Sequence, residues 1–200
     1  MKRIGIAVMT GILLQLAGGQ NVQAQDYVGC WSLQPIVGYS IPRGDFSESA
    51  KSGVMMAARV RHYMMDFYSM DFTLAISPNL GQDIPDFVDA TTKGHFGVTQ
   101  TTVDNNLYFA TGRIRPYGAA GLGLYFIKTD LETSGIGGII KDNFTDRRFG
   151  VNLGVGVEAL VGDRVGVVGD IKFHTGTQGF RLVTFGVGLN WFLNSPYGLR

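Results

Sequence analysis

The amino-acid sequence predicts an all-β fold, namely an eight-stranded antiparallel up-and-down transmembrane β-barrel. Three observations lead to this prediction. Apolar residues alternate with small or polar ones from about residue 31 to residue 193, the pattern of strands with two different faces. The connections between these strands alternate between long and short. Charged residues make up 16% of the 200 residues and aromatic residues 12%, with 29 glycines, which suits a β protein in or near a membrane.

The first residues have the features of a secretory signal peptide. Lys2 and Arg3 precede an apolar stretch, and Val22 and Ala24 are the small residues expected three positions and one position before a cleavage site at Gln25. The chain is therefore expected to divide into a signal peptide at residues 1–24, a β-barrel domain at 25–193 and a C-terminal tail at 194–200.

Composition excludes several classes of protein. No apolar run reaches the roughly 20 residues that a membrane-spanning helix needs, so a membrane crossing would have to use strands. The formal net charge is +1, and a near-neutral chain lacks the basic face that binds nucleic acid. Cys30 is the single cysteine, so an internal disulfide is impossible.

The second half of the chain shows the clearest strands. They are expected at residues 117–128, 149–159, 164–174 and 180–193. In each strand large apolar side chains occupy one face, and glycines with a few polar residues occupy the other. Glycines on the less apolar face leave room inside a small barrel for large side chains from other strands.

The first half is less regular, and strands are expected at residues 31–41, 53–63, 66–77 and 105–113. Residues 54–76 contain neither glycine nor proline, so helix propensity alone would allow a helix there. Tyr68, Met70 and Phe72 nevertheless alternate with polar residues. This alternation predicts two strands in place of a helix.

Connection lengths predict how the strands are arranged. The short connections are residues 64–65, 114–116 and 160–163, whereas residues 42–52, 78–104, 129–147 and 175–179 form the other set. Antiparallel strands place alternate connections at opposite ends. Outer-membrane barrels have short periplasmic turns and longer outward loops, and an even strand number returns both termini to one end.

The alternation also predicts which residues face the barrel interior. An arginine on the lipid side of the bilayer midplane costs about 2–4 kcal/mol, so Arg59 and Arg61 should point inward. By the same alternation the predicted lumen charge network consists of Arg59, Arg61, Asp71, Glu158, Asp170 and Lys172. Paired charges would plug the lumen, and the same residues could alternatively gate a narrow path for ions. Interfacial aromatic girdles are expected from Tyr39, Tyr63, Phe67, Tyr68, Tyr117, Phe126, Trp191 and Phe192.

Residues 38–46, 115–124, 154–157 and the aromatic last strand at 185–192 resemble small outer-membrane β-barrel proteins of the OmpX, OmpA-barrel and opacity-porin kind. The resemblance implies secretory export to the bacterial outer membrane and an envelope-structural or surface-interaction role without enzymatic activity. It also implies outer-membrane lipid and the barrel insertion machinery as partners. No residue of the sequence points to a cofactor.

Three alternative functions remain open. One is a narrow, porin-like channel for ions or solutes, and another is a soluble, lipocalin-like carrier with its apolar face inside. The third is a lipid A-modifying barrel enzyme, for which His174 would be the reacting histidine. The Ser-Asn that follows the histidine of such deacylases is missing after His174, so a solvated residue at the loop rim is expected instead. No catalytic, cofactor or metal site is predicted, and residues 79–104 and 132–148 are the candidate interaction loops.

Overall fold

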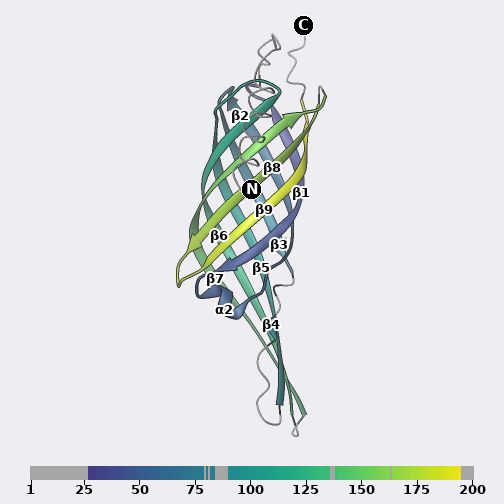
Figure 1. Ribbon diagram of the computed structural model, residues 1–200, viewed down its shortest axis with the longest axis vertical. Coiled ribbons are helices and arrows are strands. Elements are labelled where there is room, and N and C mark those ends of the chain that lie inside the picture. The colour runs from purple at the N-terminus through teal and green to yellow at the C-terminus, as the bar shows by residue number, and fades with distance from the viewer. Residues whose placement is uncertain are drawn as a thin grey trace, which may run out of the picture.

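The computed structural model describes residues 27–78, 80, 82–83, 90–135, 138–162 and 164–194. The expected signal peptide at 1–24 and tail residues 195–200 lie outside these ranges, as does part of the first candidate interaction loop. The described chain forms a closed β-barrel with long strands that extend beyond one rim (Figure 1).

Within the described chain the elements are nine strands and one short helix. They are β1 (Trp31–Arg43), α2 (Phe46–Ser49), β2 (Gly53–Met65), β3 (Tyr68–Ser77), β4 (Gln82–Asp83), β5 (Ala90–Tyr108), β6 (Ile114–Gly135), β7 (Gly138–Leu160), β8 (Val165–Gly176) and β9 (Arg181–Phe192). No helix among the described residues has the length and apolar character needed to cross a bilayer.

Eight of these strands close the barrel. They pair antiparallel in the order β3-β2-β1-β9-β8-β7-β6-β5, and pairing of β3 with β5 completes the ring. Within the described chain the two-residue β4 pairs only with β5, beyond the barrel rim. The predicted eight-stranded antiparallel barrel is therefore confirmed.

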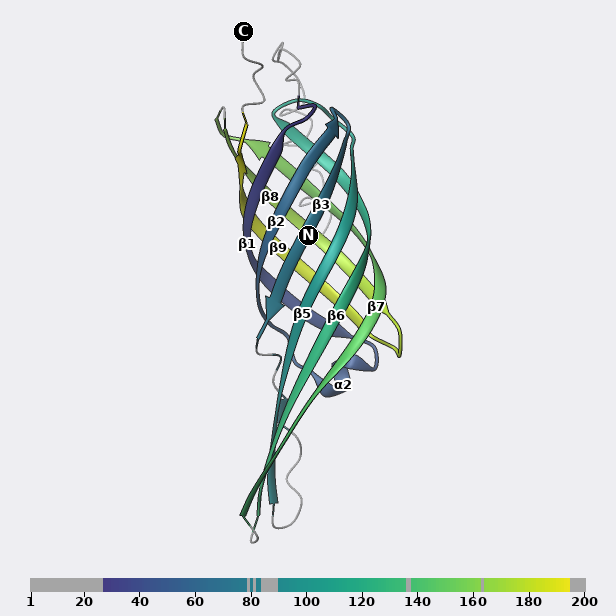
Figure 2. The ribbon, with the colours of Figure 1, turned by 180° about the vertical axis from the view of Figure 1, so that it is seen from behind.

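The two ends of the barrel differ. The short turns of the β2–β3, β5–β6 and β7–β8 connections lie at one end, here called the turn end. Tyr27 lies there too, because its backbone N–H donates to Asp66 in the β2–β3 turn, and Asn194 donates to the carbonyl of the nearby Gly29. The opposite loop end carries α2, the β3–β5 connection, the β6–β7 hairpin and the β8–β9 loop. Strands β5, β6 and β7 run far past the barrel rim at the loop end (Figure 2).

Two expected boundaries are wrong. The fourth barrel strand, expected at residues 105–113, is β5 (Ala90–Tyr108), and residues 109–113 make the turn that follows. Its outward face mixes Thr99, Thr101 and Asn105 with the apolar Val103 and Leu107, so polar residues occur on both faces and the alternation is hidden. The expected loop at 129–147 is instead a continuation of β6 and β7, which stay paired as far as Gly135 and Gly138.

Burial alternates along the strands and assigns the two faces. The outward face is apolar, as Leu153, Val155 and Val187 show with exposed fractions of 63%, 62% and 60%. The inward face carries the buried polar and charged side chains. This is the reverse of a soluble carrier barrel, whose apolar side chains point inward.

Glycines on the inward face make room for larger neighbours. A side chain at Gly156 would collide with the Tyr117 ring, and one at Gly154 would meet the Lys172 side chain at 2.7 Å. Each glycine therefore accommodates a side chain of the lumen described below.

Candidate functional site: the barrel lumen

Among the described residues, eight charged side chains line the lumen, and none is more than 8% exposed. They are Arg59, Arg61, Arg115, Lys172, Asp71, Asp104, Glu158 and Asp170. The structure brings together all six residues named from the sequence and adds Arg115 and Asp104. Four positive and four negative groups replace the three of each sign that the sequence suggested.

Arg61 connects neighbouring and opposite walls of the barrel. Its Nε and Nη2 donate to Asp71 Oδ1 and Oδ2 at 2.7 and 2.8 Å, a bidentate pair across the β2–β3 register. Its Nη1 donates to Glu158 Oε2 at 3.0 Å and to Tyr108 Oη at 2.7 Å. Bidentate, charge-assisted hydrogen bonds of this kind have a defined geometry, so Arg61 fixes β2 against both β3 and β7.

Arg59 makes a second set of contacts nearer the middle of the lumen. Its Nη2 lies 2.6 Å from Asp170 Oδ2 on β8, and its Nε lies 3.5 Å from Asp71 Oδ2. Its Nη1 donates to Gln34 Oε1 at 3.3 Å. Tyr117 Oη donates to Asp170 at 3.2 Å. Arg59 therefore couples strands that are not neighbours in the sheet.

Asp104 and Lys172 form the third group. Lys172 Nζ lies 2.6 Å from Asp104 Oδ2, and Asn152 Nδ2 donates to Asp104 Oδ1 at 2.7 Å. Sequence reasoning missed Asp104 because it began the fourth strand one residue later. The signal that could have found it is its period-two spacing from Asn106 and Tyr108.

Glu158 accepts hydrogen bonds from an unusually large set of donors at the turn end. Besides Arg61, these are the hydroxyls of Tyr63 at 3.0 Å and Tyr108 at 2.9 Å, and Asn190 Nδ2 at 2.9 Å. Because both carboxylate oxygens accept hydrogen bonds and the side chain is buried, a residue without an acceptor here would leave several buried donors unpaired.

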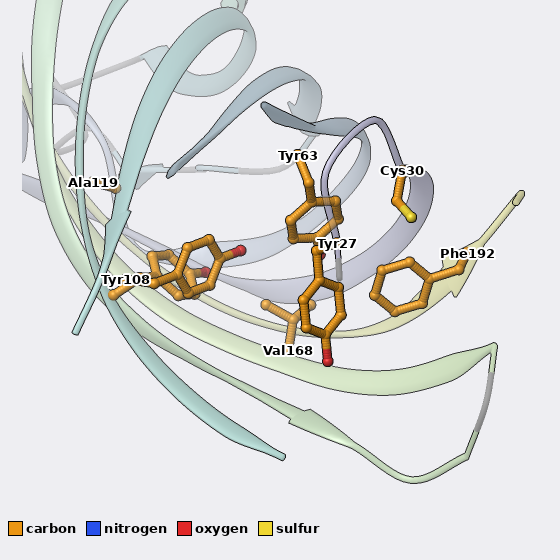
Figure 3. Close-up of a cluster of buried hydrophobic side chains, with 8 residues drawn as sticks. Tyr27, Cys30, Tyr63, Tyr108, Ala119, Val168 and Phe192 are labelled. Carbon is orange, nitrogen blue, oxygen red and sulfur yellow. The ribbon is translucent and has the colours of Figure 1, made fainter. Parts of the chain in front are cut away.

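Aromatic rings close the lumen around this carboxylate. Figure 3 shows Tyr27, Tyr63 and Phe192 gathered inside the wall, with ring centroids 5.5 to 5.9 Å apart. Tyr63, Tyr117 and Phe192, which the sequence assigned to interfacial girdles, are at most 1% exposed, so that assignment was wrong. Tyr63 shares the period-two face of Arg61, and the other two share the inward faces of β6 and β9.

Arg115 packs between two of these rings. Its guanidinium carbon lies 3.8 Å from the Tyr27 ring centroid and 4.0 Å from that of Tyr108, a cation–π arrangement. Its Nη2 donates to the carbonyl of Asp66 at 2.6 Å. Sequence reasoning placed Arg115 in a turn, although it lies on the period-two face of Tyr117. The stacked guanidinium completes the closure of the turn end.

The loop end is closed mainly by apolar side chains. This loop-end cluster contains Phe46, Ala50, Leu80, Val98, Tyr125, Ile127, Phe180 and Leu182. His174 lies beside it and is only 1% exposed, which corrects the expectation of a solvated residue. One ring nitrogen lies 3.0 Å from Tyr125 Oη and the other 3.0 Å from Thr184 Oγ1. Both nitrogens are therefore occupied within the lumen.

The arrangement of side chains in the lumen is suited to stabilising the barrel. Among the described residues no group of three or more His, Cys, Asp or Glu side chains could hold a metal ion. The charged groups instead pair with one another between an aromatic layer and an apolar layer. Such pairing compensates for the loss of water around buried charges.

Comparisons with known proteins agree with this geometry. The family model described as "Outer membrane protein beta-barrel domain" matches residues 10–191. A search of curated proteins finds no match.

Several solved structures share the fold. OprG from Pseudomonas aeruginosa is 10% identical with a TM-score of 0.61, covering 87% of this chain and 100% of its own. Neisserial surface protein A is 13% identical with a TM-score of 0.58, covering 80% and 96%. Ail, the attachment invasion locus protein of Yersinia pestis, is 12% identical with a TM-score of 0.55, covering 83% and 99%.

Proposed function

This chain belongs to the outer membrane protein beta-barrel domain family, and we propose that it acts there as a closed, non-enzymatic barrel. The lumen holds the barrel together, and the loop end serves as a surface for interaction with other molecules. Export by the signal peptide at 1–24, insertion by the general barrel machinery and contact with outer-membrane lipid are parts of the same proposal.

The pairing of charges inside the lumen carries this proposal. Each of Asp71, Asp104, Glu158 and Asp170 lies within 3.0 Å of a cationic side chain. An eight-stranded barrel has an interior that side chains nearly fill. A permeating ion would have to break these pairs and also pass the aromatic rings at the turn end.

The non-enzymatic part rests on His174. A histidine that acts as a general base must reach the group from which it takes a proton. Here its two ring nitrogens contact Tyr125 and Thr184 inside the lumen, and the side chain is 1% exposed. A lipid outside the barrel would not reach it.

Conductance in planar lipid bilayers tests closure. The full chain should give no steady conductance steps, whereas the double variant Tyr63→Ala/Tyr108→Ala, which removes two rings and two hydroxyls from the turn end, should give measurable steps. The matched control is Phe67→Ala, which removes an outward ring that is 51% exposed. Steady, selective conductance by the unaltered protein would refute closure and support the narrow-channel alternative.

A further inference from the structure

A cleft of about 270 Å³ opens at the loop end, above the loop-end cluster. We call it the mouth cleft. The residues that define its chemistry are Asp45, Phe46, Phe96, Phe144, Asp146 and Arg148. They come from the segment around α2 and from the strands β5 and β7, and Ile127 and Thr129 of β6 lie between them, so the cleft exists only when the barrel is assembled.

The strand pattern explains why β7 contributes to this cleft. Phe144, Asp146 and Arg148 have the same period-two spacing as Asn152, which points into the lumen. Where β7 continues past the rim, these side chains lie on the inner face of the protruding sheet. That face looks toward the α2 segment and the β8–β9 loop, which form the other side of the cleft.

The β8–β9 loop is held in place by the cleft residues themselves. Arg148 Nη1 donates to the carbonyl oxygen of Gln178 at 3.0 Å, and Gln178 is a non-glycine residue with a φ of 56°. Next to it, a side chain at Gly179 would lie 2.7 Å from Asp45 Oδ2. The Asp45 carboxylate therefore packs against the loop backbone at a fixed place in the cleft.

The charges in the mouth cleft do not balance. Arg148 donates from Nε to Asp146 Oδ2 at 2.8 Å, and its Nη2 lies 2.8 Å from the same oxygen, so these two side chains neutralise each other. Within the described chain the Asp45 carboxylate has neither a hydrogen bond nor an ion pair, and it does not cap α2. Among the described residues that line the cleft, one negative charge is left over.

Aromatic side chains provide the walls beside this charge. Phe96 is partly buried, and Phe144 is 53% exposed although it lies on the inner face of the sheet. The face of an aromatic ring attracts cations, and small-molecule sites are typically apolar with a few placed polar groups. The combination disfavours anions and neutral polar molecules.

From these contacts we propose that the mouth cleft binds an organic cation, an ammonium or guanidinium group carried on an apolar stem. The cation lies at Asp45, and the stem packs against Phe96 and Phe144. A free amine and a lysine or arginine side chain of a peptide share this chemistry. The proposal rests on the surface-interaction part of the proposed function and is independent of whether the lumen conducts.

Isothermal titration calorimetry of the full chain in uncharged maltoside micelles tests the site. The probes are N-acetyl-lysine amide and the uncharged N-acetyl-norleucine amide, which has a similar stem. We expect the lysine probe to bind at least tenfold more tightly than the norleucine probe. Asp45→Asn should weaken the lysine probe at least tenfold while leaving the norleucine probe unchanged.

The matched control is Asp130→Asn. This change also removes one negative charge near the rim, but Asp130 pairs with Lys128 at 3.2 Å and does not line the cleft. It should alter binding of the lysine probe less than twofold. Equal weakening by both variants would show diffuse attraction to a charged rim and would overturn the site, as would equal binding of the two probes or no binding of either.

Two further probes separate the possible sources of the cation. Tighter binding of putrescine than of the peptide acetyl-Gly-Lys-Gly-amide supports a free amine, and the reverse order supports a peptide side chain. A conducting wild-type barrel would refute closure without changing these titrations. The failure of either proposal can therefore be recognised separately.

Discussion

The two ends of the lumen are closed by different kinds of interaction. At the turn end Arg61, Arg115 and Glu158 are enclosed by tyrosine rings and hydroxyls, and none of the three is measurably exposed. At the loop end Ile127, Phe180 and their neighbours pack as an ordinary apolar cluster. A change at the turn end leaves a buried charge without its partner, whereas a change at the loop end leaves only a gap. The same barrel should therefore respond very differently to substitutions at its two ends.

The largest effect is expected at Glu158. Glu158→Ala removes the acceptor of Arg61, Tyr63, Tyr108 and Asn190, and should destabilise the barrel by about 3–5 kcal/mol, the cost of leaving a buried charge uncompensated. Urea unfolding in lipid vesicles, followed by the loss of the compact band in unboiled electrophoresis, measures this change.

The control for Glu158 is Asp130→Ala, because the Asp130 side chain is 41% exposed and pairs with an exposed lysine. Surface pairs contribute about 0–1 kcal/mol, so this variant should unfold nearly as the unaltered protein does. If the two variants unfolded at the same urea concentration, the turn end would not depend on its charges, and the contrast between the two ends would be lost.

A second prediction tests whether charge pairs in the middle of the lumen stabilise the barrel as those at the turn end do. Asp104→Asn and Lys172→Met should each destabilise the barrel, because each leaves the other group buried without its partner at 2.6 Å. The double variant should be less destabilised than the sum of the two, with a coupling of about 0.5–3 kcal/mol in a double-mutant cycle. Additive effects would contradict a direct interaction between the two groups.

The energetic cost of a buried or lipid-exposed charge also explains which parts of the structure could be predicted from the sequence. Arg59 and Arg61 were expected in the lumen because a charge on the lipid face is so costly that alternation leaves one choice, and the structure buries both side chains there. The fold followed from alternation and connection lengths. Asp104 was missed because it lies one residue before the expected start of its strand, in a part of β5 that has polar residues on both faces. Arg115 was missed because it falls in an expected turn.

Other features depend on the three-dimensional arrangement and have no local signal. The contact of Glu158 with Tyr63 joins residues 95 positions apart in the sequence. His174 is buried beside Tyr125, whose ring packs against Phe180 of the β8–β9 loop, and strand periodicity does not reveal this contact. The extension of β6 and β7 past the rim was missed because hydrogen bonding between the two strands needs no apolar face outside the bilayer.

A smaller effect is expected in the loop-end cluster. Ile127→Val removes one methylene from a side chain that is 4% exposed, and should cost about 0.5–1.5 kcal/mol by transfer and cavity terms. The same urea unfolding measures it. The control is Leu124→Ala, on the outward face of the same strand, where the side chain is 50% exposed. This change reduces apolar area but leaves the lumen intact. A loss as large as that of Glu158→Ala would mean that the loop end is as sensitive as the turn end.

The smallest effect on stability is expected in the mouth cleft. Asp45 is exposed and has no hydrogen bond or ion pair within the described chain, so Asp45→Asn breaks no interaction and should change the free energy of unfolding by no more than about 0.5 kcal/mol. Urea unfolding and the calorimetric titration of the lysine probe, made on the same preparation, check the two properties together. Unchanged unfolding with lost binding would mean that the Asp45 charge serves ligand binding. A marked loss of stability would mean instead that the carboxylate holds the β8–β9 loop in place at Gly179, so that the loop end, like the turn end, depends on a charge.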